Sequence, residues 1–261
     1  MIWHSLIILL ILVILSIGVW GISIVKNNVA IVDPCWGSGF VLVALIAMYL
    51  RDMWSTYEVI LVSLVAVWGS RLSVYLLIRN WGHAEDHRYA AMRAKRPKTF
   101  WIFSLFSVFL LQAFLLWIVS WPLQAFIHGK KDSISIFVLG VGIGLWAFGF
   151  IFETIADIQL SWFKSNPDNK GRVMDHGLWA LSRHPNYFGE FCIWWGYYLI
   201  ASSTGQFWTI FSSLLMSFLL LRVSGVALLE KDIGERRPEY REYQRRVNAF
   251  FPGLPKMPSK A

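Results

Sequence analysis

Charged residues are scarce in this sequence. Asp, Glu, Lys and Arg make up 15% of the 261 residues, whereas a soluble domain of this size carries about 25%. Hydrophobic residues make up 56%, with 15 Trp and 19 Phe among them. This balance argues against an ordinary soluble domain and predicts a chain that lies mostly in lipid.

Cysteine is nearly absent as well. The two that occur, Cys35 and Cys192, both lie in or beside apolar runs. The sequence contains no CxxC or HExxH spacing. It therefore predicts two buried free thiols, and neither a disulfide framework nor a metal site.

The sequence also shows no interdomain linker and no signal-peptide pattern in its first apolar run. No long linker, low-complexity tract or convincing internal repeat interrupts the chain, so we expect a single membrane domain over residues 1–261. The first apolar run lacks a basic start and a small-residue cleavage site, and it is too long for the apolar core of a signal peptide. We expect it to be a retained span.

What the sequence does have is a series of apolar runs near the length of a membrane span, about 20 residues. Seven such runs occur, at roughly 2–25, 35–50, 57–79, 100–127, 134–163, 187–203 and 207–229. They predict an all-α integral membrane protein with seven transmembrane helices.

The cations are distributed unevenly around these runs. With seven spans, loops 79–98 and 164–183 and the tail after 229 fall on one side and hold most of the Lys and Arg. The other side holds only Arg51, Lys130 and Lys131. The positive-inside rule then places the C-terminus in the cytoplasm and the N-terminus outside. Topology and contact with anionic lipid explain much of this charge, and its place in short loops argues against nucleic acid as a partner.

Two acidic residues lie within the fifth run. Glu153 and Asp157 are four positions apart and share a helix face with Lys164. Charged groups in a span indicate a functional site by default. The structural alternative is an ion pair between helices, with Arg71 or Arg222 as partner.

The third run carries a second polar face. Arg71, Tyr75 and Arg79 recur at every fourth position, and the chain then enters the charged segment "EDHRY", which begins at Glu85 and ends at Tyr89. In an ordinary solvated loop such a segment means little. Because the segment here directly follows an Arg-bearing helix face, its position favours a role in a functional site.

The stretch "VDPCWGSGF" precedes the second span. Asp33 and Pro34 there fit a helix start. Alternatively, Asp33 faces the same cavity as the polar faces above, and the sequence does not separate these interpretations.

The most polar octapeptide in the chain, "RHPNYFGE", opens the sixth span. Pro185 suits the first position of a helix, which puts Asn186 in the first turn and Glu190 one turn deeper. A helix N-terminus carries unpaired N–H groups and partial positive charge, and Arg183 and His184 add cations beside it. The segment predicts an anion-binding mouth at the membrane surface.

The tail reads "RRPEYREYQRRVNAFFPGLP". Tyr240 and Tyr243 are three positions apart and are surrounded by arginines. One interpretation is an amphipathic basic helix that lies on anionic lipid. The other is a lid whose Tyr and Arg side chains close over a bound head group.

One glycine-rich segment, "GVGIG" at Gly140–Gly144, superficially suggests a dinucleotide fingerprint. It lies inside an apolar run, with no preceding strand. We expect its small residues to let helices approach closely.

Together these motifs resemble the steroid 5-alpha-reductase family, and more narrowly its bacterial DUF1295-type branch. The resemblance rests on "RHPNYFGE" preceded by "DHGLWALS", on "EDHRY" after an Arg-bearing span, and on the terminal tyrosine pair followed by "FP". It covers nearly the whole chain and is strongest over residues 150–252, the expected cofactor-binding part.

The resemblance implies a seven-helix membrane reductase that uses NADPH to deliver hydride to the β-carbon of an enone. By position in the family's motif, the implied cofactor residues are Arg71, Tyr75, Asp157, Lys164, Arg172, Asn186 and Glu190. At the same mouth and in the tail we expect further cofactor contacts from Arg183, His184, Tyr187, Tyr240 and Tyr243. Pyrophosphate and 2′-phosphate groups need several Lys or Arg donors, which this region supplies.

Two departures concern the substrate end. The second span has no match to the family's Gln-Glu pair, and Trp68 stands at the position of its catalytic Tyr. A donor must polarise the substrate carbonyl, so the catalytic candidates are Tyr75, Tyr89 and Glu85, with Tyr187 as a further proton donor to consider. The substrate class extends from steroid-like compounds to fatty, isoprenoid or quinone-like ones.

Two other functions compete. The "RHP.Y.G" mouth also resembles membrane methyltransferases of the isoprenylcysteine carboxyl type, whose S-adenosylmethionine lacks phosphates. A lipid-binding or scaffolding bundle would instead use the buried charges as structural ion pairs. In each case we expect an integral protein of a bacterial inner membrane, or of the endoplasmic reticulum in a eukaryote, with any active site facing the cytoplasm.

Overall fold

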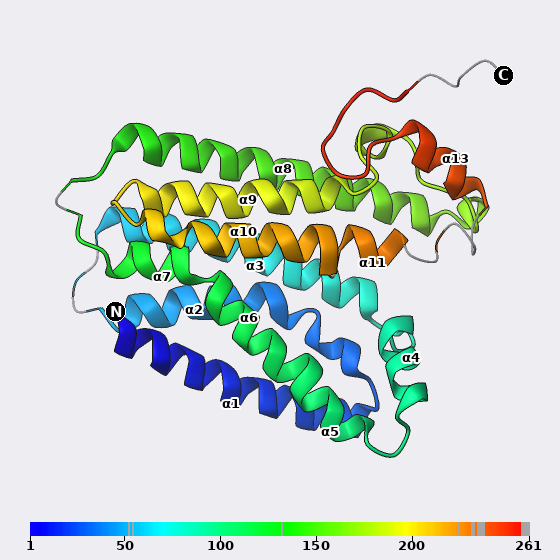
Figure 1. Ribbon diagram of the computed structural model, residues 1–261, viewed down its shortest axis with the longest axis horizontal. Coiled ribbons are helices and arrows are strands. Elements are labelled where there is room, and N and C mark those ends of the chain that lie inside the picture. Colours follow the sequence, from blue (N-terminus) through cyan, green and yellow to red (C-terminus); the bar gives the residue numbers. More distant parts are fainter. Residues whose placement is uncertain are drawn as a thin grey trace. The chain divides into compact units, whose positions relative to one another are not determined.

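The computed structural model describes residues 1–51, 53, 55–131, 133–223, 225–230, 233 and 238–256. Every regular element within these ranges is a helix (Figure 1). The chain divides into two compact units, Met1–Lys131 and Asp132–Ala261, and each is described by itself. The expected single domain stays a prediction.

The first unit is built from long apolar helices joined by short ones. Its elements are α1 (Ile2–Lys26), η1 (Val29–Val32), α2 (Cys35–Tyr49), α3 (Thr56–Asn80), α4 (His87–Lys95), α5 (Phe100–Ser104), η2 (Leu105–Leu110), α6 (Leu111–Val119) and α7 (Trp121–His128). The element η2 is a π-helix, and Pro122 stands in the first turn of α7. The fourth apolar run is therefore divided after Val119, because Ser120 and the proline-bearing start of α7 interrupt what the sequence predicts as one continuous span.

Glycines bring α2 and α3 into close contact. A Cβ atom on Gly37 would lie 2.4 Å from the Gly69 carbonyl oxygen, and one on Gly69 would lie 2.6 Å from the Gly37 oxygen. Without a hydrophobic drive between helices in lipid, such close backbone approach is what holds them together.

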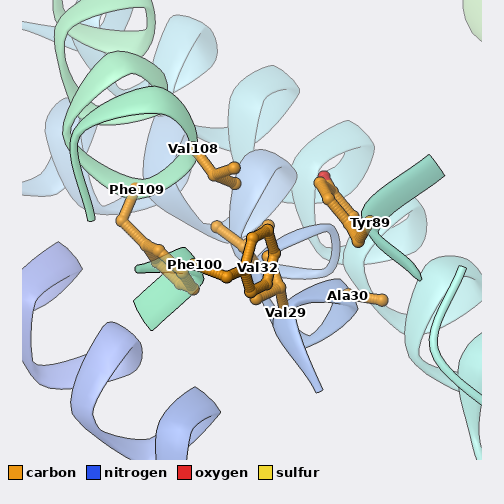
Figure 2. Packing of buried hydrophobic residues seen from close by; sticks show 7 residues of the cluster. All are labelled: Val29, Ala30, Val32, Tyr89, Phe100, Val108 and Phe109. Atoms are coloured by element: carbon orange, nitrogen blue, oxygen red, sulfur yellow. The ribbon is translucent and has the colours of Figure 1, made fainter. Parts of the chain in front are cut away.

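A small core lies where η1, α4, α5 and η2 meet (Figure 2). Its buried members are Val29, Ala30, Val32, Tyr89, Phe100, Val108 and Phe109. This core fixes the short helix α4, which carries the "EDHRY" segment, against the start of the second span.

The second unit consists of two long helices and a series of shorter ones. Its elements are α8 (Ile136–Ser165), η3 (Pro167–Asn169), η4 (Gly177–Ala180), α9 (Pro185–Ser202), η5 (Phe207–Thr209), α10 (Ile210–Phe218), η6 (Leu219–Val223), α11 (Val226–Glu230) and α13 (Glu239–Arg246). The seventh apolar run is thus divided too: η6 ends at Val223 and α11 begins at Val226.

Among the residues that the structure describes, five helical segments are long and apolar enough to cross a bilayer: Ile2–Lys26, Val29–Tyr49, Thr56–Asn80, Phe100–Val119 and Ile136–Ser165. The all-helical membrane class is therefore confirmed, with five of the seven expected spans. The other two expected spans correspond to α9, with 18 residues, and to the shorter apolar helix Phe207–Val223. Neither meets the same standard of length and composition.

Candidate functional site

The helices α8 and α9 form a tightly packed antiparallel pair (Figure 1). A Cβ atom on Gly149 of α8 would lie 2.5 Å from the Gly189 carbonyl oxygen of α9. One on Gly196 would lie 2.8 Å from the Trp146 backbone nitrogen, and one on Gly142 would lie 2.9 Å from that of Ile200. The two backbones touch along most of α9, as small residues allow in membranes.

The glycines of the "GVGIG" segment differ in whether they face α9. Gly142 faces α9, whereas Cβ atoms on Gly140 and Gly144 would meet no atom within 4 Å. The prediction that the segment serves close helix packing is confirmed at its central glycine and is wrong for the two outer ones.

Buried carboxylates cluster at one end of this pair. The exposed fractions are 2% for Glu153, 3% for Asp157 and 8% for Glu190. Asn186 donates from Nδ2 to Asp157 Oδ1 at 3.3 Å, which joins the first turn of α9 to the last turns of α8. The two helices thus bring Asp157 and Asn186 into contact, and the cofactor-binding roles expected of both stay predictions.

Cations follow directly after these acids. With 30 residues, α8 is about 45 Å long, which exceeds a hydrocarbon core of about 30 Å. Its last turn carries Lys164, and the following segment carries Lys170 and Arg172; all three are exposed. The chain therefore passes from buried acids to exposed bases within a few helical turns.

The segment after α8 is held in a defined shape by amide side chains. Asn166 accepts a hydrogen bond from the Asp168 nitrogen, Asn169 donates from Nδ2 to the Phe163 carbonyl at 2.9 Å, and Gln159 accepts one from the Leu178 nitrogen at 3.0 Å. A cavity of about 300 Å³ lies here, lined by Gln159, Trp162, Phe163, Asn166, Asn169, Met174 and His176.

The start of α9 matches the expectation. Pro185 is the first helical residue and His184 is the N-cap, so Asn186 lies in the first turn. The rings of His184 and Tyr187 stack, with centroids 5.7 Å apart and planes 6° from parallel.

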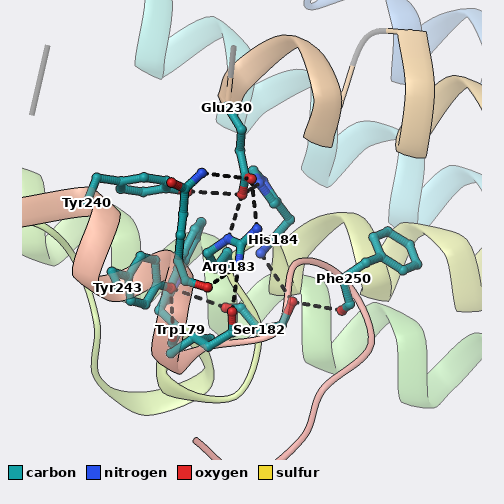
Figure 3. A network of polar contacts seen from close by, with 10 residues as sticks. Trp179, Ser182, Arg183, His184, Glu230, Tyr240, Tyr243 and Phe250 are labelled. Atoms are coloured by element: carbon teal, nitrogen blue, oxygen red, sulfur yellow. Dashed lines mark hydrogen bonds and ion pairs between the residues drawn. The ribbon is translucent and has the colours of Figure 1, made fainter. Parts of the chain in front are cut away.

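The two cations at this helix start share one carboxylate, that of Glu230 (Figure 3). Arg183 donates to it from Nε at 2.7 Å and from Nη2 at 2.8 Å, and His184 Nε2 lies 3.0 Å from Oε1. Because a carboxylate only accepts, His184 must donate from Nε2. Tyr240 and Gln244 also donate to Glu230, at 3.3 and 3.2 Å.

The electrostatics of this group favour the ionised carboxylate. Burial alone would raise the pKa of Glu230, but the hydrogen bonds and positive charges of His184 and Arg183 outweigh it and lower the pKa to about 2. Burial would lower the pKa of Arg183, and the Glu230 carboxylate raises it instead. Arg183 Nη1 also donates to the backbone oxygens of Gln244 and Val247. These contacts give both cations a structural partner within the chain.

The sequence did not single out Glu230, which ends α11. One acidic residue directly after an apolar run is the only signal it offers, and that signal is common in membrane proteins. The anion-binding role expected of Arg183 and His184 stays a prediction.

The tail helix α13 is fixed to the same place by its tyrosines (Figure 3). Tyr243 is 2% exposed and donates to the carbonyl oxygen of Trp179. Ser182, in turn, donates from Oγ to the Phe250 carbonyl at 2.7 Å. Of the two interpretations of the tail, these contacts fit a segment docked over the start of α9.

In the first unit, the "EDHRY" segment forms its own set of bonds. Glu85 accepts from Arg93 Nε at 2.9 Å and Nη2 at 2.7 Å, and from the Val29 nitrogen at 2.9 Å. Burial would raise the pKa of Glu85, and these donors lower it. The buried Tyr89 donates from its hydroxyl to Asp33 Oδ1 at 3.0 Å. Glu85 and Tyr89 thereby join α4 to η1, and their catalytic roles stay predictions.

The contacts of Asp33 test the interpretation that it caps the helix of the second span. The N-cap of α2 is Pro34, and no side chain caps this helix. The Asp33 carboxylate instead accepts from Tyr89 and lies 3.9 Å from Arg88 Nη2. The helix-cap interpretation is therefore wrong, because the Asp33 side chain accepts from Tyr89 and makes no cap bond to α2.

The polar face of α3 is partly confirmed. The Arg79 guanidinium lies 6.0 Å from the centre of the Tyr75 ring, so these two side chains share a face. Arg71 and Tyr75 are half-buried. The expected roles of Arg71, Tyr75, Lys164, Arg172, Tyr187 and Glu190 in catalysis or cofactor binding stay predictions.

Comparison with known proteins identifies the family. The DUF1295 family, described as a protein family of unknown function, matches residues 19–247. The chain belongs to this family. An uncharacterized protein of Schizosaccharomyces pombe is 31% identical over 94% of this chain and 79% of its own length.

A second relative matches over a short stretch only. A probable O-methyltransferase of Ustilaginoidea virens is 43% identical over 56 residues, which is 22% of this chain and 19% of that protein. The matched stretch thus covers about a fifth of each of the two proteins. No solved structure matches.

Proposed function

We propose that this DUF1295 protein is a membrane-embedded reductase that uses NADPH to reduce a carbon–carbon double bond conjugated to a carbonyl in a lipophilic substrate. The observation that carries the proposal is the contact of the half-buried Asn186 with the buried Asp157, beside the buried Glu153 and Glu190. A polar group of this kind within membrane helices marks a ligand or proton path. The choice of NADPH as the cofactor rests on the resemblance to steroid 5-alpha-reductases.

The phosphate groups of NADPH would be held by Lys164, Lys170 and Arg172. These exposed cations lie within nine positions, on a segment that Asn166 and Asn169 shape. Arg183 enters this set less readily, since Glu230 and two backbone carbonyls take its donors. Three cations suit a molecule with a pyrophosphate and a 2′-phosphate.

The purine end would fit the cavity at the end of α8. Its volume of about 300 Å³ accommodates part of a dinucleotide, and its lining combines aromatic rings with amides. Trp162, Phe163 and His176 offer flat faces for a base, while Asn166 and Asn169 offer polar groups for its edge.

The other end of the cofactor supplies hydride. Asn186 and Asp157 provide one donor and one acceptor for an amide, and the apolar helices around them exclude water from the reaction. For the proton, the predicted donors are Tyr75, Tyr89 and Glu85. The hydroxyl of Tyr89 points to Asp33, and Glu85 is paired with Arg93.

Deuterium transfer tests this chemistry. The full chain in detergent is supplied with NADPH deuterated at C4 of the nicotinamide and with a panel of lipophilic enones. The expected result is deuterium at the β-carbon of the reduced product. Consumption of NADPH without label in any product would contradict the proposal.

We further propose the seven-span topology, with α9 as the sixth span and the apolar helices within residues 207–229 as the seventh. It places the N-terminus outside and the basic segments, with the active site, in the cytoplasm. Cysteine scanning in a Cys35→Ala/Cys192→Ala background, with a membrane-impermeant maleimide, tests it. In the Lys170→Cys variant we expect labelling from the cytoplasmic side only. Labelling from the opposite side would contradict the proposed orientation.

A second candidate is a methyltransferase that uses S-adenosylmethionine. The 56-residue similarity to a probable O-methyltransferase favours it, as do the contacts of Arg183 and His184 with Glu230, which occupy donors that a phosphate would need. S-adenosylmethionine carries no phosphate and needs fewer cations. Transfer of a labelled methyl group to a lipophilic acid or alcohol by the same preparation would replace the reductase proposal.

A further inference from the structure

The first unit contains a cavity of its own, of about 370 Å³. Helices α1, α2 and α6 supply its walls together with η1 and η2, and its lining includes Leu12, Ser16, Cys35, Trp36, Gln112 and Leu116. Among the described residues that line it, none is charged. A volume in this range holds a ligand of modest size.

Its most polar lining residue is Gln112, in the first turn of α6. This turn directly follows the π-helix Leu105–Leu110, a feature frequent at functional sites. No hydrogen bond joins the Gln112 side chain to another residue that the structure describes. By contrast, Gln124 of the following helix donates to Ser120 Oγ at 2.8 Å. A primary amide that faces an apolar cavity is costly unless a ligand completes its hydrogen bonds.

Two other polar groups of the cavity are less available. Ser38 donates within its own helix to the oxygens of Pro34 or Cys35, at 3.3 and 3.4 Å. The Cys35 thiol donates to the Ile31 carbonyl at 3.5 Å. Ser16 and Trp36 add one hydroxyl and one indole N–H to the lining. Gln112 has the largest hydrogen-bonding capacity of these groups, since its amide can both donate and accept.

This chemistry selects one class of ligand. With no cation or anion in the lining, a phospholipid head group or a nucleotide would lose its hydration without compensation. A ligand with an apolar body and one neutral oxygen is compensated for its lost hydration. The apolar walls pack against its hydrocarbon, and the Gln112 amide donates a hydrogen bond to its oxygen.

We propose that this cavity binds a neutral lipophile that carries one carbonyl or hydroxyl group, with the Gln112 amide as the hydrogen-bonding partner of that oxygen. The site lies wholly within Met1–Lys131 and needs no nucleotide. It therefore stands whether or not the reductase proposal does, and it is testable without NADPH.

Cys35 makes the test direct because it lines the cavity and the chain has one other cysteine. In a full-length Cys192→Ala variant in detergent, the rate of Cys35 modification by a lipophilic maleimide is measured with increasing probe. The probes are a fourteen-carbon methyl ketone and the alkane of the same length. In the matched Cys35→Ala variant, neither probe should alter labelling of Cys192.

The ketone is expected to slow Cys35 modification at a concentration about threefold to tenfold lower than the alkane, the worth of one net hydrogen bond. In Gln112→Leu the two probes should act alike, and Gln112→Asn should restore part of the difference. Equal protection by both probes in the Cys192→Ala protein, which needs no change at Gln112, would overturn the proposal. Protection by neither probe would overturn it as well.

Discussion

Arg183 donates two hydrogen bonds to Glu230, at 2.7 Å from Nε and 2.8 Å from Nη2, although 47 positions separate the two residues in the chain. The side chains are 10% and 14% exposed. This ion pair ties the start of α9 to the end of α11, and through Tyr240 it reaches the tail helix α13.

Replacing Glu230 by Ala should therefore be severe. It leaves a buried guanidinium without its carboxylate, a change that costs about 3 to 5 kcal/mol in other proteins. We expect the free energy of unfolding in detergent to fall by about that amount, and protease cleavage near α13 to become faster. Glu239→Ala is the matched control, since Glu239 is exposed at the start of the tail helix α13. Equal stability of the two variants would show that the pair contributes little.

The same carboxylate predicts a pH dependence. The pKa of Glu230 is lowered from 4.5 to about 2, so its contribution to stability is full above pH about 4.5 and is lost as the pH falls toward 2. The difference in unfolding free energy between wild type and Glu230→Gln should be constant from pH 8 to 5 and should shrink below pH 4.5. A difference that shrinks already between pH 7 and 5 would refute the lowered pKa.

The packing of α8 on α9 gives a third prediction. In Gly149→Ala the new Cβ meets the Gly189 carbonyl oxygen at 2.5 Å, so one backbone must shift. Overpacking of this kind costs about 1 to 3 kcal/mol. Gly144→Ala, on the same helix, meets no neighbour and should be neutral or stabilising by up to about 1 kcal/mol. Thermal unfolding of both variants decides the matter, and the account fails if Gly144→Ala is the more harmful change.

In the first unit, the bond from Tyr89 to Asp33 is the feature to test. Tyr89→Phe removes the donor and leaves a largely buried carboxylate oxygen without it, which costs about 1 to 3 kcal/mol. Tyr49→Phe serves as the control because Tyr49 is 87% exposed. Unfolding free energies that agree between the two variants would mean that the bond to Asp33 has no structural weight.

Local signals in the sequence predicted much of this arrangement. Pro185 predicted the start of α9, because proline fits the first helical position and ends what precedes it. The four-residue spacing of Glu153 and Asp157 predicted a shared face, and both side chains are buried. These features depend on residues close together in the chain.

Contacts between distant segments were not predictable in the same way. Glu230 follows an apolar run and has no periodic partner, so nothing in the sequence ties it to Arg183 and His184. The identity of the packing glycine was likewise hidden: Gly140, Gly142 and Gly144 look alike in sequence, and only the direction of α9 distinguishes Gly142. The interruption of the fourth run has a local signal in Pro122, which a count of apolar residues does not register.

Equilibrium binding of NADPH to the full chain in detergent tests the central claim most directly. The account predicts saturable binding that weakens about tenfold or more in Asn186→Ala and in Arg172→Ala. It also predicts unchanged binding in Lys26→Ala, a cation at the end of α1. A protein that does not bind NADPH, and whose thermal midpoint rises with S-adenosylmethionine, would contradict it.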